Sequence, residues 1–252
     1  MDCWLCGAIA ITGEHKIKRT VIDKLMFENN KINSPVKLFS NNANKPQFIR
    51  SSKSDHLKYK KNLCEYCNNT RTQPFDISYD IFFKYLIENE KNIFLSNRIG
   101  LKNIKSEYNR NFSQKDLFKY FIRAFCCVID STKETQDPLS VPTKLIDALC
   151  GKEYGKELMI QFCSNGDLKN YPLNKIIRVS NHNLHEYNGK FAFIYCESYG
   201  WFHISYIYQD FCLTRNDTKL FKKEVENYWV GKSSEIKIVH DRGESSLKNI
   251  RL

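Results

Sequence analysis

The chain has 252 residues, of which 42% are hydrophobic and 13% aromatic, and its net charge is +11, from 39 Lys and Arg against 28 Asp and Glu. This apolar content is enough for a packed core and argues against wholesale disorder. No run of eighteen apolar residues is present, which excludes a membrane-spanning helix and a membrane partner. The N-terminus lacks the basic and then apolar pattern of a secretion signal, so we expect a cytoplasmic protein with reduced cysteines.

The excess of positive charge attracts polyanions and therefore indicates nucleic acid as a partner. Charge alone does not decide this point. Lys, Asn and Ile are abundant along the whole chain, and a solvated basic surface combined with a compositional bias explains the same excess.

The part of the chain before residue 75 shows little regular pattern. Apolar residues recur at helical spacing within 20–27, which predicts a short helical segment. Two short segments, 36–39 and 46–49, predict the strands of a hairpin inside a long polar loop.

Helical periodicity becomes clear after Pro74. Apolar stripes predict one helix over 75–89 and a second over 113–130, where Ser113 followed by Asp116 is typical of a capping box. A third, short helix is expected between Pro142 and Gly151, over 143–150.

The rest of the chain is rich in strand patterns. Asn188-Gly189 is a strong tight-turn signal, and the segment 197–200 is suited to join two strands in a hairpin. A helix over 218–229 and a last strand over 236–240 are also expected. The main predicted strands cover 157–163, 175–179, 190–197 and 201–208.

These elements predict an α+β fold in two parts. Residues 1–90 form a module organised by metal, and residues 91–252 form an α+β region with helices and an antiparallel sheet. This second region contains no motif of its own that indicates chemistry. Substrate binding, binding of a protein partner and restraint of the first module are its alternative roles.

The ten cysteines fall into two groups. Four of them form two C-x-x-C pairs, Cys3 with Cys6 and Cys64 with Cys67, which supply the four thiolates of a closed structural zinc site. The other six lie among hydrophobic neighbours, and we interpret them as small apolar core residues. They are Cys126, Cys127, Cys150, Cys163, Cys196 and Cys212.

Three further residues near these pairs are not needed for the zinc. Glu14 and His15 are adjacent, and Asn68 directly follows the last cysteine of the quartet. A carboxylate and an amide oxygen suit a Mg²⁺ or Mn²⁺ ion, and histidine suits a general base near neutral pH. Adjacent residues on a strand face opposite ways. A bulge or turn at Gly13 is therefore required to bring Glu14 and His15 to one site.

This pattern resembles the HNH endonucleases with a ββα-metal fold. It is most similar to the zinc-stapled variant found in phage junction-resolving endonucleases. The resemblance implies that Glu14 and Asn68 hold the catalytic divalent ion and that His15 is the general base. It also implies that Cys3, Cys6, Cys64 and Cys67 bind the structural zinc.

Three features differ from the family's usual pattern. Glu14 stands where many members have Asp, and the segment 16–19 lacks the usual proline. Tyr59 stands where many members have a middle asparagine, although Asn62 lies nearby.

Basic residues flank the motif. Groups beside a phosphodiester site hold the nucleic-acid backbone without reading bases, and a solvated charged face is the alternative for each of them. For Arg71, pairing with Asp76 or Asp80 is an equally good explanation. The candidate phosphate contacts are Lys16, Lys18, Arg19, Lys60, Lys61 and Arg71.

The sequence thus predicts a metal-dependent HNH endonuclease that hydrolyses phosphodiester bonds, with DNA as the expected substrate. Small HNH proteins with such extensions often resemble components of bacterial restriction or phage defence. Two alternatives are a zinc-dependent nucleic-acid-binding module without catalysis and a subunit that only docks a protein partner.

Overall fold

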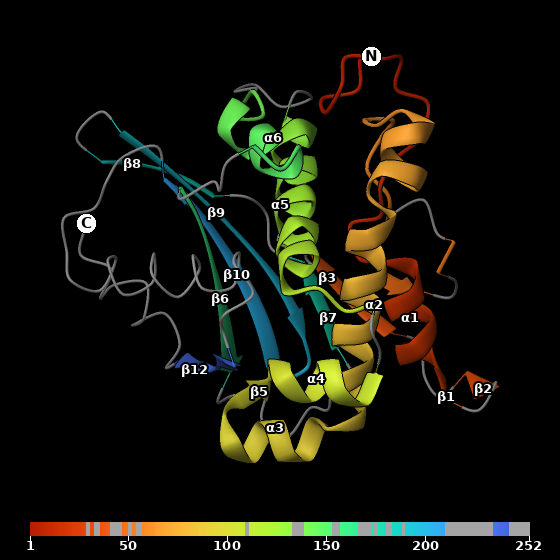
Figure 1. The fold of residues 1–252 in the computed structure, drawn as a ribbon, viewed down its shortest axis with the longest axis vertical. Helices are drawn as coiled ribbons and strands as arrows, with labels where there is room; N and C mark the ends of the chain where they lie inside the picture. The colour runs from red at the N-terminus through yellow and green to blue at the C-terminus, as the bar shows by residue number, and fades with distance from the viewer. Residues whose placement is uncertain are drawn as a thin grey trace.

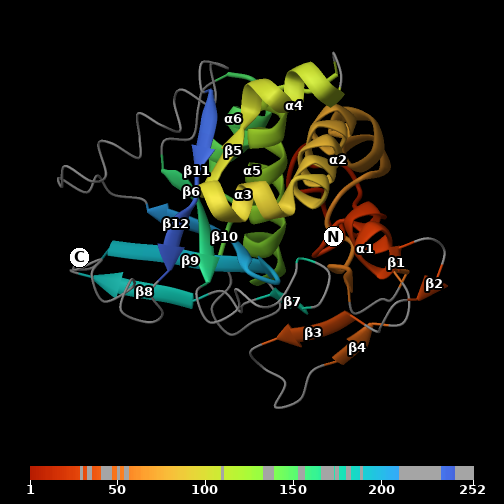
Figure 2. The same ribbon diagram turned by 90° about the horizontal axis from the view of Figure 1, so that it is seen from below.

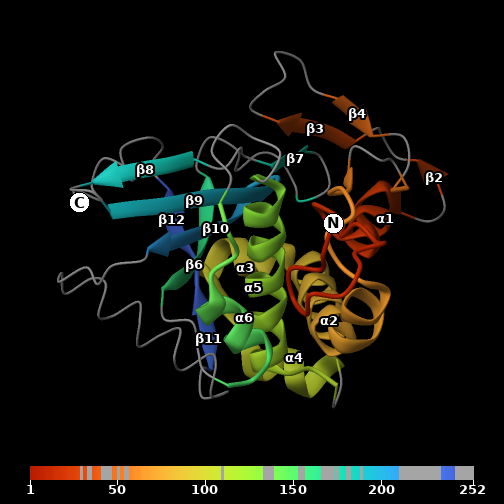
Figure 3. The same ribbon diagram turned by 90° about the horizontal axis from the view of Figure 1, so that it is seen from above.

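A computed structural model describes the chain at residues 1–28, 31–32, 36–40, 47–49, 52–53, 57–108, 111–132, 139–152, 157–165, 173, 176–179, 183–187, 190–209 and 234–241. The fold combines helices with a largely antiparallel sheet, which confirms the α+β class. The longest helices lie over one face of the main sheet (Figures 1 and 2). The N-terminal segment runs beside these helices (Figure 3).

The three helices predicted over 75–89, 113–130 and 143–150 are confirmed to within two residues at each end, as α2, α5 and α6. The short helix predicted over 20–27 is confirmed as α1, whereas the α3 and α4 helices were not predicted. The helices are α1 (Arg19–Met26), the π-helix η2 (Tyr66–Arg71), α2 (Gln73–Glu88), α3 (Glu90–Ser96), α4 (Leu101–Tyr108), α5 (Gln114–Ser131) and α6 (Thr143–Leu149).

The α5 helix is the centre of the core. It begins at a capping residue, since the backbone N–H of Asp116 donates to the Ser113 hydroxyl at 3.2 Å, as the sequence predicted. Its buried face includes Phe121 and Phe125, whose rings contact those of Phe162 and Tyr206 on the sheet. Aromatic packing of this kind fixes the helix against the strands.

The main sheet has eight strands in the order β12-β6-β10-β9-β7-β3-β4, with β8 paired to β9. Most neighbours are antiparallel, but β12 with β6 and β3 with β7 are parallel. The strands are β1 (Phe27–Glu28), β2 (Lys31–Ile32), β3 (Val36–Ser40), β4 (Gln47–Ile49), β5 (Arg98–Gly100), β6 (Leu158–Asn165), β7 (Ile176–Val179), β8 (Asn183–Tyr187), β9 (Lys190–Tyr199), β10 (Phe202–Gln209), β11 (Glu235–Lys237) and β12 (Val239–Asp241).

Two predicted hairpins are present. β3 and β4 pair antiparallel, and β9 pairs with β10 across a turn in which Gly200 has a φ of 52°. The predicted last strand is divided at Ile238 into β11 and β12. The Asn188-Gly189 turn and the predicted helix over 218–229 lie outside the described residues.

The interpretation of the scattered cysteines as core was wrong for one of them. Cys126, Cys127 and Cys163 are buried, but Cys150 is exposed. Cys150 is the C-cap residue that follows α6. It faces solvent there, although its sequence neighbours are apolar. Cys196 is half-buried, and Cys212 lies outside the described part of the chain.

One cluster of buried side chains contains residues from both predicted parts. It includes Cys3 and Leu63 from the N-terminal part and Phe125 and Tyr206 from the rest. None of the described helices combines the length and the apolarity that a bilayer crossing needs.

Glu197 is a carboxyl buried within this core. It is 3% exposed, and the hydroxyls of Tyr199 and Tyr206 donate to its two oxygens at 3.1 and 3.3 Å. Burial raises the pKa of Glu197 from its ordinary value of 4.5 to about 7, because the charged form is disfavoured away from water.

We predict that this group makes stability fall as pH rises. Between pH 4.5 and 7 the folded chain keeps a proton that the unfolded chain has lost, so the free energy of unfolding decreases by about 3 kcal/mol across that window. Glu197→Gln should remove this decrease, as measured by urea unfolding at pH 5 and pH 8. Equal pH dependence in wild type and variant would contradict the assignment.

Candidate metal centre

Two extended segments near the N-terminus pair antiparallel and lead into a helix. Thr12 is paired with Leu63, and His15 with Lys58. The backbone N–H of Lys16 donates to the Leu57 carbonyl at 2.6 Å. The second segment then enters η2. This order of strand, strand and helix brings both C-x-x-C pairs to one end of the unit.

The four paired cysteines form a compact sulfur cluster. Their Sγ atoms all lie within 4.8 Å of one another, and the Sγ atoms of Cys6 and Cys64 are 3.6 Å apart. Zn–S bonds of 2.3 Å in a tetrahedron place sulfurs roughly 3.8 Å apart, so the cluster has the size that zinc requires. Cys3, Cys64 and Cys67 are buried and Cys6 is exposed.

Each C-x-x-C pair is shaped by local hydrogen bonds. The Cys3 carbonyl accepts from the N–H of Cys6 at 3.3 Å and of Gly7 at 2.8 Å. Gly7 has a φ of 78°, a conformation that favours glycine. The N–H of Cys67 donates to the sulfur of Cys64 at 3.4 Å. This hydrogen bond is the largest of the effects that lower the pKa of Cys64 to about 7, which favours the thiolate that binds metal.

The strand pair is irregular at Gly13, as the sequence required. Two residues separate Thr12 from His15, whereas four separate their partners Lys58 and Leu63. The extra residues bring the segment 57–63 close to Gly13. A Cβ atom on residue 13 would lie 2.3 Å from the Tyr59 carbonyl oxygen. Only glycine fits this approach.

Asn62 stabilises the same irregular segment. It is 4% exposed, and its side-chain oxygen accepts from the backbone N–H of Glu14 at 3.4 Å. Its own backbone N–H donates to the Thr12 carbonyl at 2.9 Å. Asn62 therefore binds the backbone on both sides of Gly13. The sequence had shown only that Asn62 lies near Tyr59, which stands where many family members have an asparagine.

Glu14 lies against the C-terminal part of the chain. Its carboxylate is 3.7 Å from the guanidinium of Arg123 on α5, and its side chain is 12% exposed. Burial raises the pKa of Glu14, although the charge of Arg123 acts in the opposite direction. The Glu14 carboxylate thus has a cationic partner within the protein.

His15 has different neighbours. Burial lowers its pKa, and the nearby charges of Lys58 and Arg19 lower it further, so the neutral imidazole predominates near pH 7. Its Nε2 atom is buried and has no hydrogen-bond partner among the described residues. The groups that surround His15 differ from those around Glu14, and the convergence of both residues on one ion stays a prediction.

Asn68 lies in η2, one residue beyond Cys67. Its backbone N–H donates to the Cys64 carbonyl at 3.0 Å, which orients the residue relative to the sulfur cluster. Its side-chain oxygen is buried, and no hydrogen-bond partner for it lies in the described part of the chain. A buried amide oxygen of this kind is a suitable ligand for a hard cation.

Several of the candidate phosphate contacts make contacts within the protein. Lys18 lies 3.1 Å from Asp76 and 2.9 Å from Asp80. Arg71 donates to the sulfur of Cys150 at 2.9 Å, a partner that neither interpretation of Arg71 had named. Both side chains thus have partners within the protein, and their role in binding phosphate stays a prediction.

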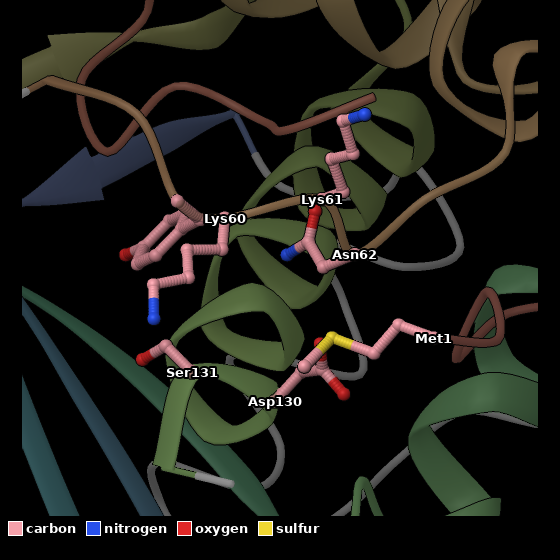
Figure 4. A pocket seen from close by; sticks show the side chains of 7 residues that line it. Met1, Lys60, Lys61, Asn62, Asp130 and Ser131 are labelled. Carbon is pink, nitrogen blue, oxygen red and sulfur yellow. The ribbon is translucent and has the colours of Figure 1, made fainter. Parts of the chain in front are cut away.

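The other candidates are more accessible or differently placed. Arg19 is exposed and lies 3.6 Å from Asp23, and Lys16 lies 5.9 Å from the ring centre of Tyr59. Lys60 and Lys61 are exposed. They line a small pocket (Figure 4), where the side chain of Lys60 extends toward Ser131 and that of Lys61 extends the other way.

Comparison with known proteins identified no relative: no family model, no curated protein and no solved structure matches this chain. The chemistry of the centre therefore has to be argued from its own residues.

Proposed function

We propose that this protein is a metal-dependent endonuclease of the HNH type that hydrolyses phosphodiester bonds in DNA. The observation that carries the proposal is the pair of partnerless polar atoms, His15 Nε2 and Asn68 Oδ1. Both atoms are buried. His15 lies between the two C-x-x-C pairs in the sequence, and Asn68 directly follows the second pair. Buried polar atoms are nearly always hydrogen-bonded in proteins. Other described residues also have such an atom, for example Trp4 Nε1 and Asn97 Oδ1, and it is the predicted chemistry of His15 and Asn68 that leads us to take their atoms as kept for a ligand.

The proposed roles follow from the chemistry of these groups. A Mg²⁺ or Mn²⁺ ion held by Glu14 and Asn68 would neutralise charge on the phosphate and on the leaving oxygen. His15 accepts a proton from water, the water oxygen bonds to phosphorus, and the bond from phosphorus to the leaving oxygen breaks. The zinc held by the four cysteines is structural and takes no part in this reaction.

Basic residues near the centre support a nucleic-acid substrate. Lys60 and Lys61 are exposed and directly precede Asn62, which ties down the backbone of Glu14. Their ammonium groups are suited to phosphate contacts at the edge of the proposed site. The net charge of +11 supports attraction of the whole protein to the DNA backbone.

A second candidate is a nucleic-acid-binding module without catalysis. The ion pair between Glu14 and Arg123 at 3.7 Å favours it, because a carboxylate already paired with a cation is a weaker metal ligand. In this case the zinc would stabilise a binding surface only.

An assay with supercoiled plasmid separates the two candidates. We expect the zinc-loaded protein to nick the plasmid when Mg²⁺ or Mn²⁺ is added and to leave it intact when neither is present. Salt-sensitive binding without cleavage of duplex DNA, branched DNA, single strands or RNA would contradict the nuclease and support the binding module.

A further inference from the structure

A buried arginine from the C-terminal part of the chain contacts the proposed metal site. Arg123 is 1% exposed. Its guanidinium binds both oxygens of Asp76, at 2.7 and 3.0 Å, and donates to the Thr72 hydroxyl at 2.5 Å. The same Nη2 atom that binds Asp76 lies 3.7 Å from Glu14.

These contacts distribute one cation between two carboxylates. Asp76 has the shorter, two-pronged contact, which is the stronger geometry for an arginine and a carboxylate. Glu14 has the longer one. Asp76 also lies 3.1 Å from Lys18, so it has a second cationic neighbour. The strength of the contact between Arg123 and Glu14 therefore depends on how firmly Asp76 holds the guanidinium.

We propose that Arg123 is a positioning residue that restrains the metal site, by holding the Glu14 carboxylate against α5 in competition with the divalent cation. The inference rests on the proposed function, because it takes Glu14 as a ligand of that cation. A guanidinium and a divalent ion repel each other when they share one carboxylate, and the repulsion is strong where water is largely excluded. Arg123 is buried in the packed helix α5, so its guanidinium stays near Glu14 when the cation binds.

The inference makes opposite predictions for two related variants. Asp76→Asn removes the negative charge of the stronger acceptor. Arg123 then interacts more strongly with Glu14, and cation binding weakens. The double variant Arg123→Met with Asp76→Asn removes one positive and one negative charge together. It releases Glu14 without changing the local net charge, and cation binding tightens. Removing both partners of a buried pair also disturbs folding far less than removing one.

The test is a Mn²⁺ titration of the zinc-loaded, full-length protein, followed by electron paramagnetic resonance. We expect about tenfold tighter binding for the double variant and about tenfold weaker binding for Asp76→Asn, a step of one order in the binding constant. The matched control is the double variant Lys84→Met with Glu88→Gln. It removes an exposed ion pair, with a distance of 3.7 Å, from α2, the helix that also contains Asp76. Its Mn²⁺ affinity should equal that of wild type.

Two further results fix the interpretation. Adding Glu14→Gln to the double variant should abolish the tight binding, which places the ion at Glu14. Unchanged, weaker or absent Mn²⁺ binding in the folded double variant overturns the restraint by Arg123, as does tighter binding in Asp76→Asn. If the affinities shift as expected but no variant cleaves DNA, the nuclease fails and the restraint stands.

Discussion

Removal of zinc is expected to unfold the strand pair of residues 11–16 and 57–63, a loss on the order of 10 kcal/mol at neutral pH. The pairing between residues 11–16 and 57–63 has only two strands, which is too few for independent stability. Cys3 and Cys67 are almost fully buried, so loss of the metal would remove its bonds to two sulfurs in the protein interior. A metal bound by the four cysteines would therefore hold together two segments that are distant in the sequence.

Metal analysis and thermal unfolding measure this effect. We expect one zinc per chain and a large drop in the melting temperature after chelation. Cys67→Ser should lose the zinc, whereas Cys150→Ser should keep it, because Cys150 is exposed and outside the quartet. A zinc-free protein with the melting temperature of wild type would show that the cluster is not a structural metal site.

Replacing the proposed base is expected to lower the cleavage rate about 10² to 10⁴-fold, the usual contribution of a general base. His15→Ala removes the imidazole but leaves the backbone pairing of residue 15 with Lys58 intact. The half-buried side chain is small enough that folding should survive, and an unchanged melting temperature would show that it does. Cleavage rates under identical Mn²⁺ concentrations measure the effect.

A neighbouring pair of asparagines gives the matched control for this site. Asn68→Ala removes the buried amide oxygen, for which the described residues offer no hydrogen-bond partner, whereas Asn69 is exposed one residue further along η2. We expect Asn68→Ala to reduce cleavage as His15→Ala does, and Asn69→Ala to cleave as wild type. Cleavage at the wild-type rate by His15→Ala, Asn68→Ala and Asn69→Ala alike would contradict the catalytic roles of both His15 and Asn68.

Features with a local cause were predictable from the sequence. The spacing of the C-x-x-C pairs predicted the sulfur cluster, since each pair spans one turn. Ser113 and Asp116 predicted the start of α5. The need for an irregular backbone at Gly13 followed from the adjacency of Glu14 and His15, and the unequal spacing of the strand pair supplies it.

Features that depend on distant contacts were not predictable. Arg123 lies in the middle of an amphipathic helix, where it gives no signal that it will meet Glu14 and Asp76. The contact of Arg71 with Cys150 depends on how α6 packs near η2, which no local pattern specifies. Burial of Cys150 was predicted wrongly for the same reason: its apolar neighbours describe the helix before it, and Cys150 itself ends that helix.

The central claim is that the zinc-held segments bring His15 and Asn68 to one hydrolytic centre, and metal-specific anomalous scattering tests it most directly. In crystals grown with zinc and soaked in Mn²⁺, we expect a zinc peak about 2.3 Å from the four cysteine sulfurs. A separate manganese peak should lie roughly 2 Å from the Asn68 side-chain oxygen, with Glu14 as its second protein ligand and His15 Nε2 facing its bound water. A zinc peak in place with manganese absent from Asn68, or bound elsewhere, would contradict the account.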